Sequence, residues 1–495
     1  MDWITIVVVL LSALTLSHGY RVLYSTWVKK HPPGPTPLPI IGNIHLLGNQ
    51  PHKSLAKLAK THGPLMRLRL GFINTVVISS SAMAKEVLQK QDLAFSSRWA
   101  PDALHACDHS NYSVVWLPVA ARWRSLRKVL TSNIFSGSRL DANQHLSSRK
   151  VQELIAYCGS SSQTGEAVDV GRAAFRTSLN LLSNTIFSVD LADPFSDSGK
   201  EFKDLVCNIM VEAGKPNLVD YFPFLEKIDP QGIRRRMTFH FEKVIELFSC
   251  LIAERLEKGE SKDSETNDVI DVLLATSKEN PEEMDRTHIE RLCLDMFVAG
   301  TDTTSNTLEW AMTEAIRNPE IMKKAKSELE EIVGKGKIIS EEEVQRLPYL
   351  RCMVKETLRI HPPVPFLIPR KVEEDVQVCG YTVPRNSQIL VNAWAIGRDG
   401  DAWKNPLEFK PERFLGSEID VRGRDFELIP FGAGRRICPG LPLAIRMVPV
   451  ILGSLLNSFD WKLEGGSSPD EVDVEEKFGI TLQKAIPLRA VPIPL

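Results

Sequence analysis

The sequence predicts a mainly α-helical protein with small β-sheets, folded as one large domain behind an N-terminal membrane anchor. Three observations lead to this prediction. Apolar residues recur at helical spacing along most of the chain, runs typical of strands are short and few, and neither a repeat nor a low-complexity linker interrupts the 495 residues. The net charge of −2 gives no reason to expect a nucleic-acid partner, and eight cysteines without CxxC spacing argue against a disulfide framework or a zinc site.

We expect residues 1–24 to form a transmembrane anchor. The segment from Trp3 to Tyr20 contains no Asp, Glu, Lys or Arg. As a helix it would be about 27 Å long, close to the thickness of a bilayer core of about 30 Å. Arg21, Lys29 and Lys30 follow it, so the positive-inside rule places the rest of the chain in the cytosol. The alternative is a cleaved signal peptide, but a basic n-region and a clear cleavage site are missing.

Residues 25–39 are predicted to be a basic, proline-rich hinge, and residues 40–495 the domain that carries the function. Five prolines between His31 and Pro39 exclude a helix and stiffen the chain into an extended form. This segment is a linker, and its position suggests a spacer that sets the orientation of the domain on the membrane.

Helices are predicted where apolar residues recur at spacings of three and four. The segments are Ser54–Thr61, Ala82–Gln91, Arg122–Leu130, Arg149–Tyr157, Ala173–Phe187, Phe239–Leu256, Arg286–Arg317 and Glu320–Val333. Strands are predicted at Leu65–Leu70, Thr75–Ser79, Val376–Cys379, Tyr381–Val383 and Gln388–Asn392. The charged, weakly periodic residues Glu257–Asn267 are predicted to be a loop.

The segment Phe431–Gly440, FGAGRRICPG, surrounds one cysteine with glycines and places two arginines before it. Gly432 and Gly434 allow positive φ and close backbone approach. Such a loop can direct backbone N–H groups toward the sulfur of Cys438. These groups and the nearby positive charge are expected to lower the pKa of the thiol, as a metal ligand requires. The alternative is a buried structural cysteine.

The pattern Phe431, Gly434, Arg436, Cys438 and Gly440 resembles the haem-binding loop of the cytochrome P-450 superfamily, the haem-thiolate monooxygenases. The resemblance implies the fold of that superfamily, with haem b as the cofactor and Cys438 as its axial thiolate ligand. It also implies O2 as a substrate and electrons from NADPH, delivered by NADPH-cytochrome P-450 reductase. The expected location is therefore the endoplasmic reticulum membrane, with the catalytic domain facing the cytosol.

The predicted helix Arg286–Arg317 contains AGTDTT at Ala299–Thr304, which is poor helix chemistry because Gly and β-branched Thr are disfavoured in helices. A local violation of this kind in a long apolar helix is often a functional site. Gly300 would let another group approach the backbone, and Thr hydroxyls can bond to preceding carbonyls and bend the helix. The alternative is a structural kink in a core helix.

The same segment resembles the oxygen-activating sequence of the superfamily. By spacing, one face of the helix would hold Met296, Ala299, Gly300, Thr303 and Thr307. The resemblance implies that Ala299 and Gly300 line a groove over the iron. It also implies that Thr303 hydrogen-bonds the dioxygen and that Asp302 feeds protons inward.

Glu356 and Arg359 are three residues apart on a predicted helix, an arrangement that alone would be a surface ion pair worth a few tenths of a kcal/mol. Arg413 follows in the segment Pro411–Phe414, PERF. Together the three residues resemble the buried Glu-Arg-Arg triad of the superfamily. Their role would be structural, because removing one partner would strand charge in a low dielectric.

The two haem propionates need cationic partners, which the resemblance implies at Trp123 and Arg127, a WxxxR pair, and at Arg370 and Arg436. Arginine suits this task because its planar fork can bind carboxylates through two hydrogen bonds.

The helix that holds Arg127 also carries Arg122, Arg124 and Lys128. A run of cations is usually a solvated face. Here we interpret it as a docking patch for an acidic electron donor, the reductase.

Four further stretches resemble plant geraniol 8-hydroxylases: PHKSLAKLAK at 51–60, EVLQKQDLAFSSR at 86–98, YSVVWLPVAARWRSLRK at 112–128 and EKFGITLQKA at 476–485. The resemblance implies hydroxylation of a monoterpene alcohol, geraniol or nerol, with geraniol giving 8-hydroxygeraniol. Trp99 is bulkier than the small residue typical of these enzymes. Other small terpenoids, prenylated phenols and aromatics therefore stay open as substrates.

We expect a small apolar substrate, because the candidate pocket residues are mostly apolar. They are Ala103, Val114, Val115, Met296, Ala299, Val364, Ile368, Gly479 and Ile480. Two other functions are compatible with a haem-thiolate loop: an isomerase or dehydratase that uses peroxide, and a non-catalytic haem-binding protein. The presence of Asp302 and Thr303 argues against both.

Overall fold

The computed structural model describes Trp3 and residues 30–192, 198–258 and 268–495. Apart from Trp3, the predicted anchor lies outside the described residues, as do the first part of the predicted hinge and most of the predicted loop Glu257–Asn267.

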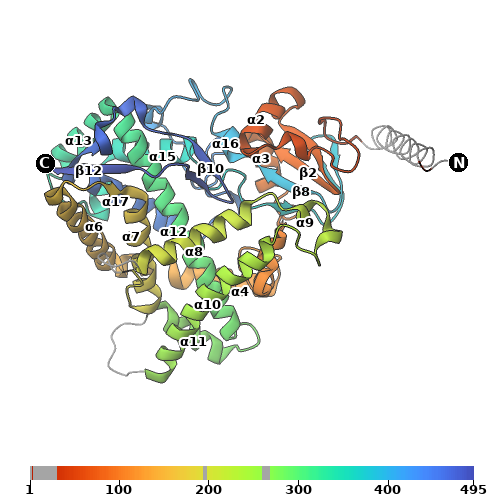
Figure 1. Ribbon diagram of the computed structural model, residues 1–495, viewed down its shortest axis with the longest axis horizontal. Coiled ribbons are helices and arrows are strands. Elements are labelled where there is room, and N and C mark those ends of the chain that lie inside the picture. The colour runs from red at the N-terminus through yellow and green to blue at the C-terminus, as the bar shows by residue number, and fades with distance from the viewer. Residues whose placement is uncertain (1–2, 4–29, 193–197, 259–267) are drawn as a thin grey trace.

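A long helix, α12 (Arg286–Arg317), runs through the helical part of the molecule (Figure 1). It packs most extensively against α7 (Val170–Phe187), and α15 (Pro348–Ile360) and α17 (Leu441–Ser458) also contact it. Most of its side chains are buried. Ala299, in the middle of this helix, is nevertheless exposed, which indicates that α12 borders an internal space.

The ends of α12 follow from local sequence. The side chain of Asp285 accepts a hydrogen bond from the backbone N–H of His288 at 2.9 Å, and His288 completes a capping box. Asn318 and Pro319 follow the last helical residue, and proline favours a break there. The sequence predicts both ends correctly because both carry such signals.

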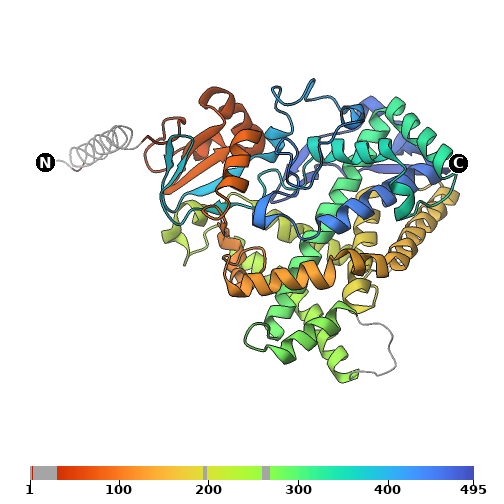
Figure 2. The ribbon, with the colours of Figure 1, turned by 180° about the vertical axis from the view of Figure 1, so that it is seen from behind.

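A five-stranded sheet forms the smaller, β-rich end of the molecule (Figures 1 and 2). Its order is β1 (Leu65–Leu70), β2 (Ile73–Ile78), β8 (Gln388–Val391), β5 (Arg370–Lys371) and β3 (Ser97–Arg98). β2 and β8 are parallel, and the other neighbours are antiparallel. The register of β3 and β5 sets Arg98 directly opposite Arg370.

Smaller sheets complete the β-structure. One has the order β4 (Val168–Asp169), β12 (Arg489–Pro494) and β9 (Phe459–Leu463), and two hairpins pair β6 (Val376–Val378) with β7 (Tyr381–Val383) and β10 (Glu476–Phe478) with β11 (Leu482–Lys484). The β10–β11 hairpin lies against α12 through β11.

The remaining α-helices are α2 (Pro51–His62), α3 (Ser81–Lys85), α4 (Ala121–Val129), α5 (Gly137–Ala142), α6 (Gln144–Thr164), α8 (Ser198–Gly214), α9 (Leu218–Tyr221), α10 (Ile233–Lys258), α11 (Val269–Glu279), α13 (Pro319–Ile332), α14 (Glu341–Val344) and α16 (Ala393–Ile396). Short 3-10 or π turns are η1 (Ile44–Leu46), η2 (Glu86–Lys90), η3 (Asp102–Asn111), η4 (Leu130–Ile134), η5 (Pro223–Leu225), η6 (Pro411–Phe414), η7 (Gly434–Arg436), η8 (Glu464–Gly466) and η9 (Pro469–Glu471).

The predicted mainly α-helical fold with small β-sheets is confirmed, and so are the predicted strands, within a few residues at their ends. Among the longer helices, α8, α11 and α17 were not predicted. Among the described residues, α17 alone is long and apolar enough to cross a membrane, but 72% of it is buried inside the protein. α17 is therefore a core helix, and its apolar residues on all sides obscure the helical periodicity.

Candidate active site

A cavity of about 650 Å³ lies beside α12. Met296, Ala299 and Thr303 line it from this helix, and Cys438 lines it from the glycine-rich loop. Two motifs far apart in the sequence therefore meet at one internal space.

The glycine-rich loop depends on backbone conformations that other residues adopt rarely. Gly432 and Gly434 have φ of +70° and +69°. A Cβ atom on Gly434 would lie 2.2 Å from the carbonyl oxygen of Leu88. The predicted need for glycine at both positions is confirmed, and at Gly434 close packing adds to it.

Cys438 is held by the backbone of its own loop. Its N–H donates to the carbonyl of Phe431 at 3.0 Å, and the N–H groups of Gly440 and Leu441 donate to its sulfur. These two donors and Arg127 act to lower the pKa of the thiol, but burial outweighs them and the pKa of Cys438 is raised. The expectation of a lowered pKa was therefore wrong for the thiol in its protein surroundings, because it left out desolvation.

Two arginines face each other at the cavity. Arg98 and Arg370 are opposite one another in β3 and β5, and both line the cavity. Their Nη1 atoms donate to the carbonyls of Ile368 and Phe95 at 2.8 and 2.9 Å, whereas neither Nε has a partner among the described residues. Like charges directly opposite each other destabilise a strand pair. This geometry therefore suits an anionic ligand that both guanidinium groups can contact.

The same burial affects their pKa values. Desolvation lowers the pKa of Arg370 to about 10 and holds that of Arg98 well below its usual range. The positive charges of Arg370, Arg436 and Arg127 add to the shift of Arg98. An anion in the cavity would offset this unfavourable concentration of positive charge.

Two more cationic side chains and a tryptophan continue this wall. The guanidinium group of Arg436 lies 4.7 Å from the ring centre of Trp123 and donates to the carbonyl of Leu117. Burial, together with Arg370 and Arg127, lowers its pKa to about 9. Nη2 of Arg127 donates to the carbonyl of Ile437 at 2.5 Å, so α4 is tied directly to the cysteine loop.

The AGTDTT segment is helical, and the side chains of Thr301, Thr303 and, one turn later, Thr307 bond back to the helix. The hydroxyl of Thr303 donates to the carbonyl of Ala299 at 2.7 Å, and that of Thr307 donates to the carbonyl of Thr303 at 2.8 Å. Gly300 lines the cavity, but a Cβ atom there would lie 2.8 Å from Cδ1 of Leu182 in α7. Gly300 therefore also permits close packing of α12 against α7, which the sequence interpretation did not include.

Asp302 is fully buried and points toward the β10–β11 hairpin. Its carboxylate accepts hydrogen bonds from Thr481 at 2.6 Å, Gln483 at 3.0 Å and Asn306 at 3.1 Å. Burial raises the pKa of Asp302 to about 6, although these donors and the charge of Lys203 act to lower it. Asp302 is not among the described residues that line the cavity, whereas Thr481 is.

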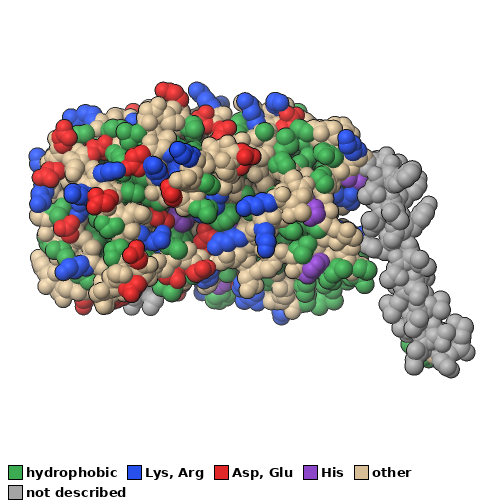
Figure 3. Space-filling model, turned by 90° about the horizontal axis from the view of Figure 1, so that it is seen from above, with side chains coloured by type: hydrophobic (Ala, Val, Ile, Leu, Met, Phe, Trp, Pro, Cys, Tyr) green, Lys and Arg blue, Asp and Glu red, His purple; other side chains and the backbone are tan. Residues whose placement is uncertain are grey.

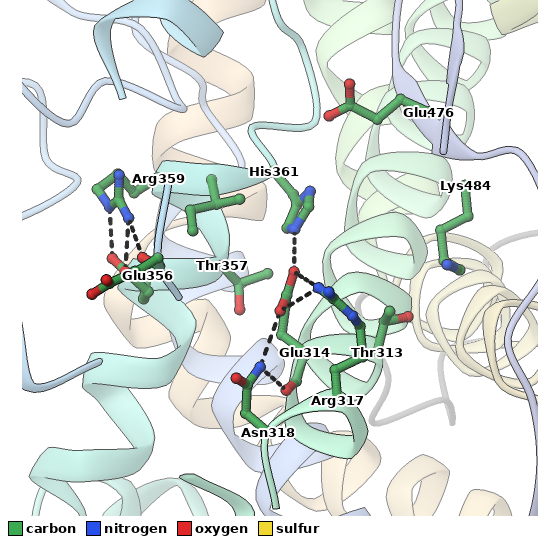
Figure 4. Close-up of polar contacts among 12 residues, drawn as sticks. Thr313, Glu314, Arg317, Asn318, Glu356, Thr357, Arg359, His361, Glu476 and Lys484 are labelled. Atoms are coloured by element: carbon green, nitrogen blue, oxygen red, sulfur yellow. Dashed lines mark hydrogen bonds and ion pairs between the residues drawn. The ribbon is translucent and has the colours of Figure 1, made fainter. Parts of the chain in front are cut away.

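Glu356, Arg359 and Arg413 form one buried network. Arg359 binds Glu356 through two hydrogen bonds of 2.7 and 2.8 Å, as Figure 4 shows, and Arg413 adds a third of 2.9 Å. Glu356 and Arg359 are 0% and 1% exposed. The Arg359 guanidinium group also donates to backbone carbonyls of Gly397 and Glu408, so its polar atoms are satisfied. The arrangement is the buried triad that the resemblance implies and not a surface pair.

Comparison with known proteins settles the family. The model of the family Cytochrome P-450 matches residues 32–487. The chain belongs to this family. It is 72% identical to a geraniol 8-hydroxylase of Catharanthus roseus over the full length of both chains, and 71% identical to one of Swertia mussotii, with 100% and 99% of the chains covered. It is also 59% identical over both full lengths to a 7-ethoxycoumarin O-deethylase of Helianthus tuberosus.

Members of the cytochrome P-450 family carry haem with a cysteine thiolate ligand and receive electrons from NADPH through a reductase. The cavity fits this cofactor. A cysteine sulfur with two N–H groups directed at it lies on one part of the wall, and four arginines, of which Arg370 and Arg436 are buried, lie on another. The facing pair with unpartnered Nε atoms, Arg98 and Arg370, suits the two carboxylates of a haem.

Most candidate pocket residues lie on the cavity wall. These are Val114, Val115, Met296, Ala299, Val364, Ile368 and Ile480. Ala103 and Gly479 are not among the described residues that line it. Ala103 is 1% exposed in the apolar core, and Gly479 packs against the backbone of Met210 and Val211.

No role was predicted from the sequence for Arg98 or Asp295, and His109 and Thr481 were covered only as members of the candidate pocket segments 103–115 and 479–481; all four line the cavity. Arg98 and Thr481 fall within stretches that resemble the plant enzymes, and that position was the available signal. His109 and Asp295 carry no motif. Their contact across 186 positions of sequence appears only in the folded chain.

Proposed function

We propose that this cytochrome P-450 hydroxylates geraniol, and its isomer nerol, with O2 and electrons from NADPH, and that geraniol yields 8-hydroxygeraniol. The observation that carries the proposal is the 72% identity to a geraniol 8-hydroxylase over the full length of both chains. The cavity supports it, because a mostly apolar wall suits a ten-carbon alcohol with a single polar group. Burial of such a chain contributes about 25 cal/mol per Å² of apolar surface.

In this proposal the sulfur of Cys438 would hold haem b. Coordination removes the thiol proton, so the raised pKa of the free thiol is no obstacle, and the N–H groups of Gly440 and Leu441 then stabilise the sulfur charge. The carboxylates of the haem are held by Arg98, Arg127, Arg370 and Arg436, with Trp123 supporting Arg436. When bound there, the haem would supply the activation of O2 through which one oxygen atom is inserted into a C–H bond of the substrate.

Asp302 supplies protons to this reaction, and Thr303 and Thr481 carry them. A carboxyl group with a pKa of about 6 is near the value at which it both takes and releases a proton readily at neutral pH. Thr481 binds Asp302 at 2.6 Å and lines the cavity, so its hydroxyl connects the buried carboxyl group to the reaction space. Thr303 presents its hydroxyl on the cavity wall from α12.

The reductase docks on α4 in this proposal. Arg122, Arg124 and Lys128 are exposed on this helix. Arg127, on the same helix, donates a hydrogen bond to the carbonyl of Ile437 beside Cys438. α4 therefore joins a basic surface to the cysteine loop, which is the arrangement an acidic electron donor requires.

The β-rich end of the molecule faces the endoplasmic reticulum membrane in this proposal, with residues 1–24 as a single-pass anchor, 25–39 as the hinge and 40–495 in the cytosol. Exposed apolar side chains gather at this end, and Figure 3 shows apolar side chains there. Phe72 is 54% and Phe224 71% exposed, and their ring centres are 6.1 Å apart. Ile40, 66% exposed, lies close to where the described chain begins at Lys30. An apolar surface of this kind is typical of a membrane-facing site.

Turnover tests the substrate. Purified protein with reductase, NADPH and geraniol is expected to give 8-hydroxygeraniol as the main product, and nerol is expected to react because the distal half of its chain is the same. The matched control omits NADPH. If geraniol gave no product while 7-ethoxycoumarin or a prenylated phenol did, the substrate would be wrong and the monooxygenase class would stand.

A further inference from the structure

We propose that the contact between the end of α8 and the β10–β11 turn sets the size of the alcohol that fits the cavity, and that Gly214 is the residue that permits this contact. The inference rests on the proposed function, because it concerns the same substrate and the same cavity. Gly214 is the last residue of α8, and the turn, residues 479–481, joins β10 to β11. The haem and proton-delivery chemistry above assigns no role to Gly214.

The turn approaches α8 with no side chain between them. A Cβ atom on Gly214 would lie 2.0 Å from the backbone nitrogen of Ile480 and 2.1 Å from the carbonyl carbon of Gly479. The N–H of Ile480 donates to the carbonyl of Met210 in α8 at 3.2 Å. Glycine allows two backbones to come this close because it has no Cβ atom. We call the backbone contact between Gly214 and residues 479–480 the seam.

The helix itself does not explain the glycine at this position. Glycine at a helix end usually serves a left-handed conformation, but the φ of Gly214 is not positive. Within a helix, glycine is less favourable than almost every other residue. The close approach of the turn is therefore the reason that the structure offers for Gly214.

Three consecutive residues of the hairpin each bind a different part of the cavity wall. The N–H of Ile480 binds α8, and the hydroxyl of Thr481 binds Asp302 of α12 at 2.6 Å. The N–H of Leu482 donates to the carbonyl of Pro363 at 2.7 Å. Ile480, Thr481 and Pro363 line the cavity. A shift of the turn would therefore change the shape of the cavity directly.

The base of the hairpin is held in place. Glu476, the first residue of β10, is 6% exposed. Its carboxylate accepts a hydrogen bond from Nε1 of Trp394 at 3.1 Å and lies 2.9 Å from Nζ of Lys53. The hairpin is thus fixed at its base and meets the cavity at its tip. A clash at the seam must be relieved at the tip of the hairpin or by α8.

Alanine at position 214 would force the seam apart. Ordinary van der Waals contact begins at 3.4 Å, so a Cβ atom at 2.0 Å requires a separation larger by about 1.4 Å, the difference between the two distances. Met210 and Ala213 line the cavity on the α8 side of the seam, and Ile480 lines it on the other side. Moving the two sides apart widens the cavity at this place. With glycine, the closed seam therefore limits the size of the bound chain.

Binding titrations of the haem-loaded protein test the seam. The ligands are geraniol and farnesol, which carries the same alcohol group on a chain that is longer by one five-carbon unit. The measured quantity is the ratio of the two dissociation constants, because partial unfolding lowers the amount of binding protein but leaves this ratio unchanged. Gly214→Ala is expected to shift the ratio in favour of farnesol by about threefold or more, as burial of one additional methylene group allows.

Two further variants complete the experiment. Ile480→Ala shortens the side chain that lines the cavity beside the seam and keeps the backbone contact, and it is expected to shift the ratio in the same direction. Gly159→Ala is the matched control, because Gly159 lies inside α6 and a Cβ atom there would meet no other atom within 4 Å. This control is expected to leave the ratio unchanged.

A folded, haem-loaded Gly214→Ala with the ratio of the parent would overturn the role of Gly214. Should Gly214→Ala fail to fold, Ile480→Ala decides: a shift in favour of farnesol supports the seam, and an unchanged ratio overturns it. Failure of the proposed function looks different, because geraniol would then give no hydroxylated product with the parent. Hydroxylation of geraniol by the parent, together with unshifted ratios in both variants, would refute the seam alone.

Discussion

Asp302 should make the protein less stable as pH rises through about 6, and Asp302→Asn should remove this dependence. The carboxyl group is buried, and burial raises its pKa to about 6 despite the hydrogen bonds from Thr481 and Gln483. Lys203 and Cys207 of α8 act on the same site. The charge of Lys203 lowers the pKa of Asp302, and burial keeps the pKa of Cys207 at about 12, so this thiol stays neutral.

The size of the effect follows from the pKa difference between the folded and unfolded chain. An unfolded aspartate titrates near 3.9, so the shift is about 2 units, which corresponds to about 3 kcal/mol in the free energy of unfolding. Because the folded pKa is the higher one, the stabilisation is complete below about pH 4 and is lost as pH rises through about 6. Asparagine carries no charge and should show no such loss.

The assay is urea unfolding of the haem-loaded protein between pH 4 and pH 8, for the parent and Asp302→Asn. The difference in unfolding free energy between variant and parent is expected to grow by about 3 kcal/mol in favour of the variant over this range. Asp92→Asn is the control, because Arg435 lowers the pKa of Asp92 instead of raising it. The stability that this carboxylate contributes is lost only as pH falls, so the effect of Asp92→Asn should be constant above about pH 5. A pH-independent difference for Asp302→Asn would refute the reasoning.

Two other predictions concern the cavity wall. Thr303→Ala should still bind haem and substrate but form less product per NADPH and more peroxide. Thr301→Ala is the control and should behave as the parent, since Thr301 is fully buried and bonded to Phe297. Equal product yield for both variants would contradict the role of Thr303. Arg370→Leu removes the repulsion between Arg370 and Arg98 in the haem-free protein, yet it should speed the loss of haem to a scavenging apoprotein severalfold. An unchanged rate of haem loss would show that this pair does not hold the cofactor.

The sequence predicted those elements that carry a clear local signal. α12 has a cap at one end and proline at the other, so both boundaries could be located. α17 was missed because 72% of it is buried, and a helix that is apolar on all sides shows little amphipathic pattern. The small sheets at the C-terminal end include β12, whose pairing with β4 joins positions far apart in the chain, which no local pattern reveals.

The candidate site divides in the same way. Motif residues such as Cys438 and Thr303 could be identified because their spacing is specific, and the structure brings them to one cavity. The pKa of Cys438 was misjudged because desolvation depends on the surrounding fold. No role was predicted for Arg98, because its place opposite Arg370 depends on the strand register, which appears only in the folded chain.

The measurement that tests the account most directly is the absorption spectrum of the reduced protein with carbon monoxide, for the parent and Cys438→Ser at matched haem content. The parent is expected to absorb at the position of thiolate-ligated haem, and Cys438→Ser is expected to lose this band while haem remains bound. A haem-loaded Cys438→Ser with the spectrum of the parent would contradict the assignment of Cys438 as the ligand and, with it, the proposed active site.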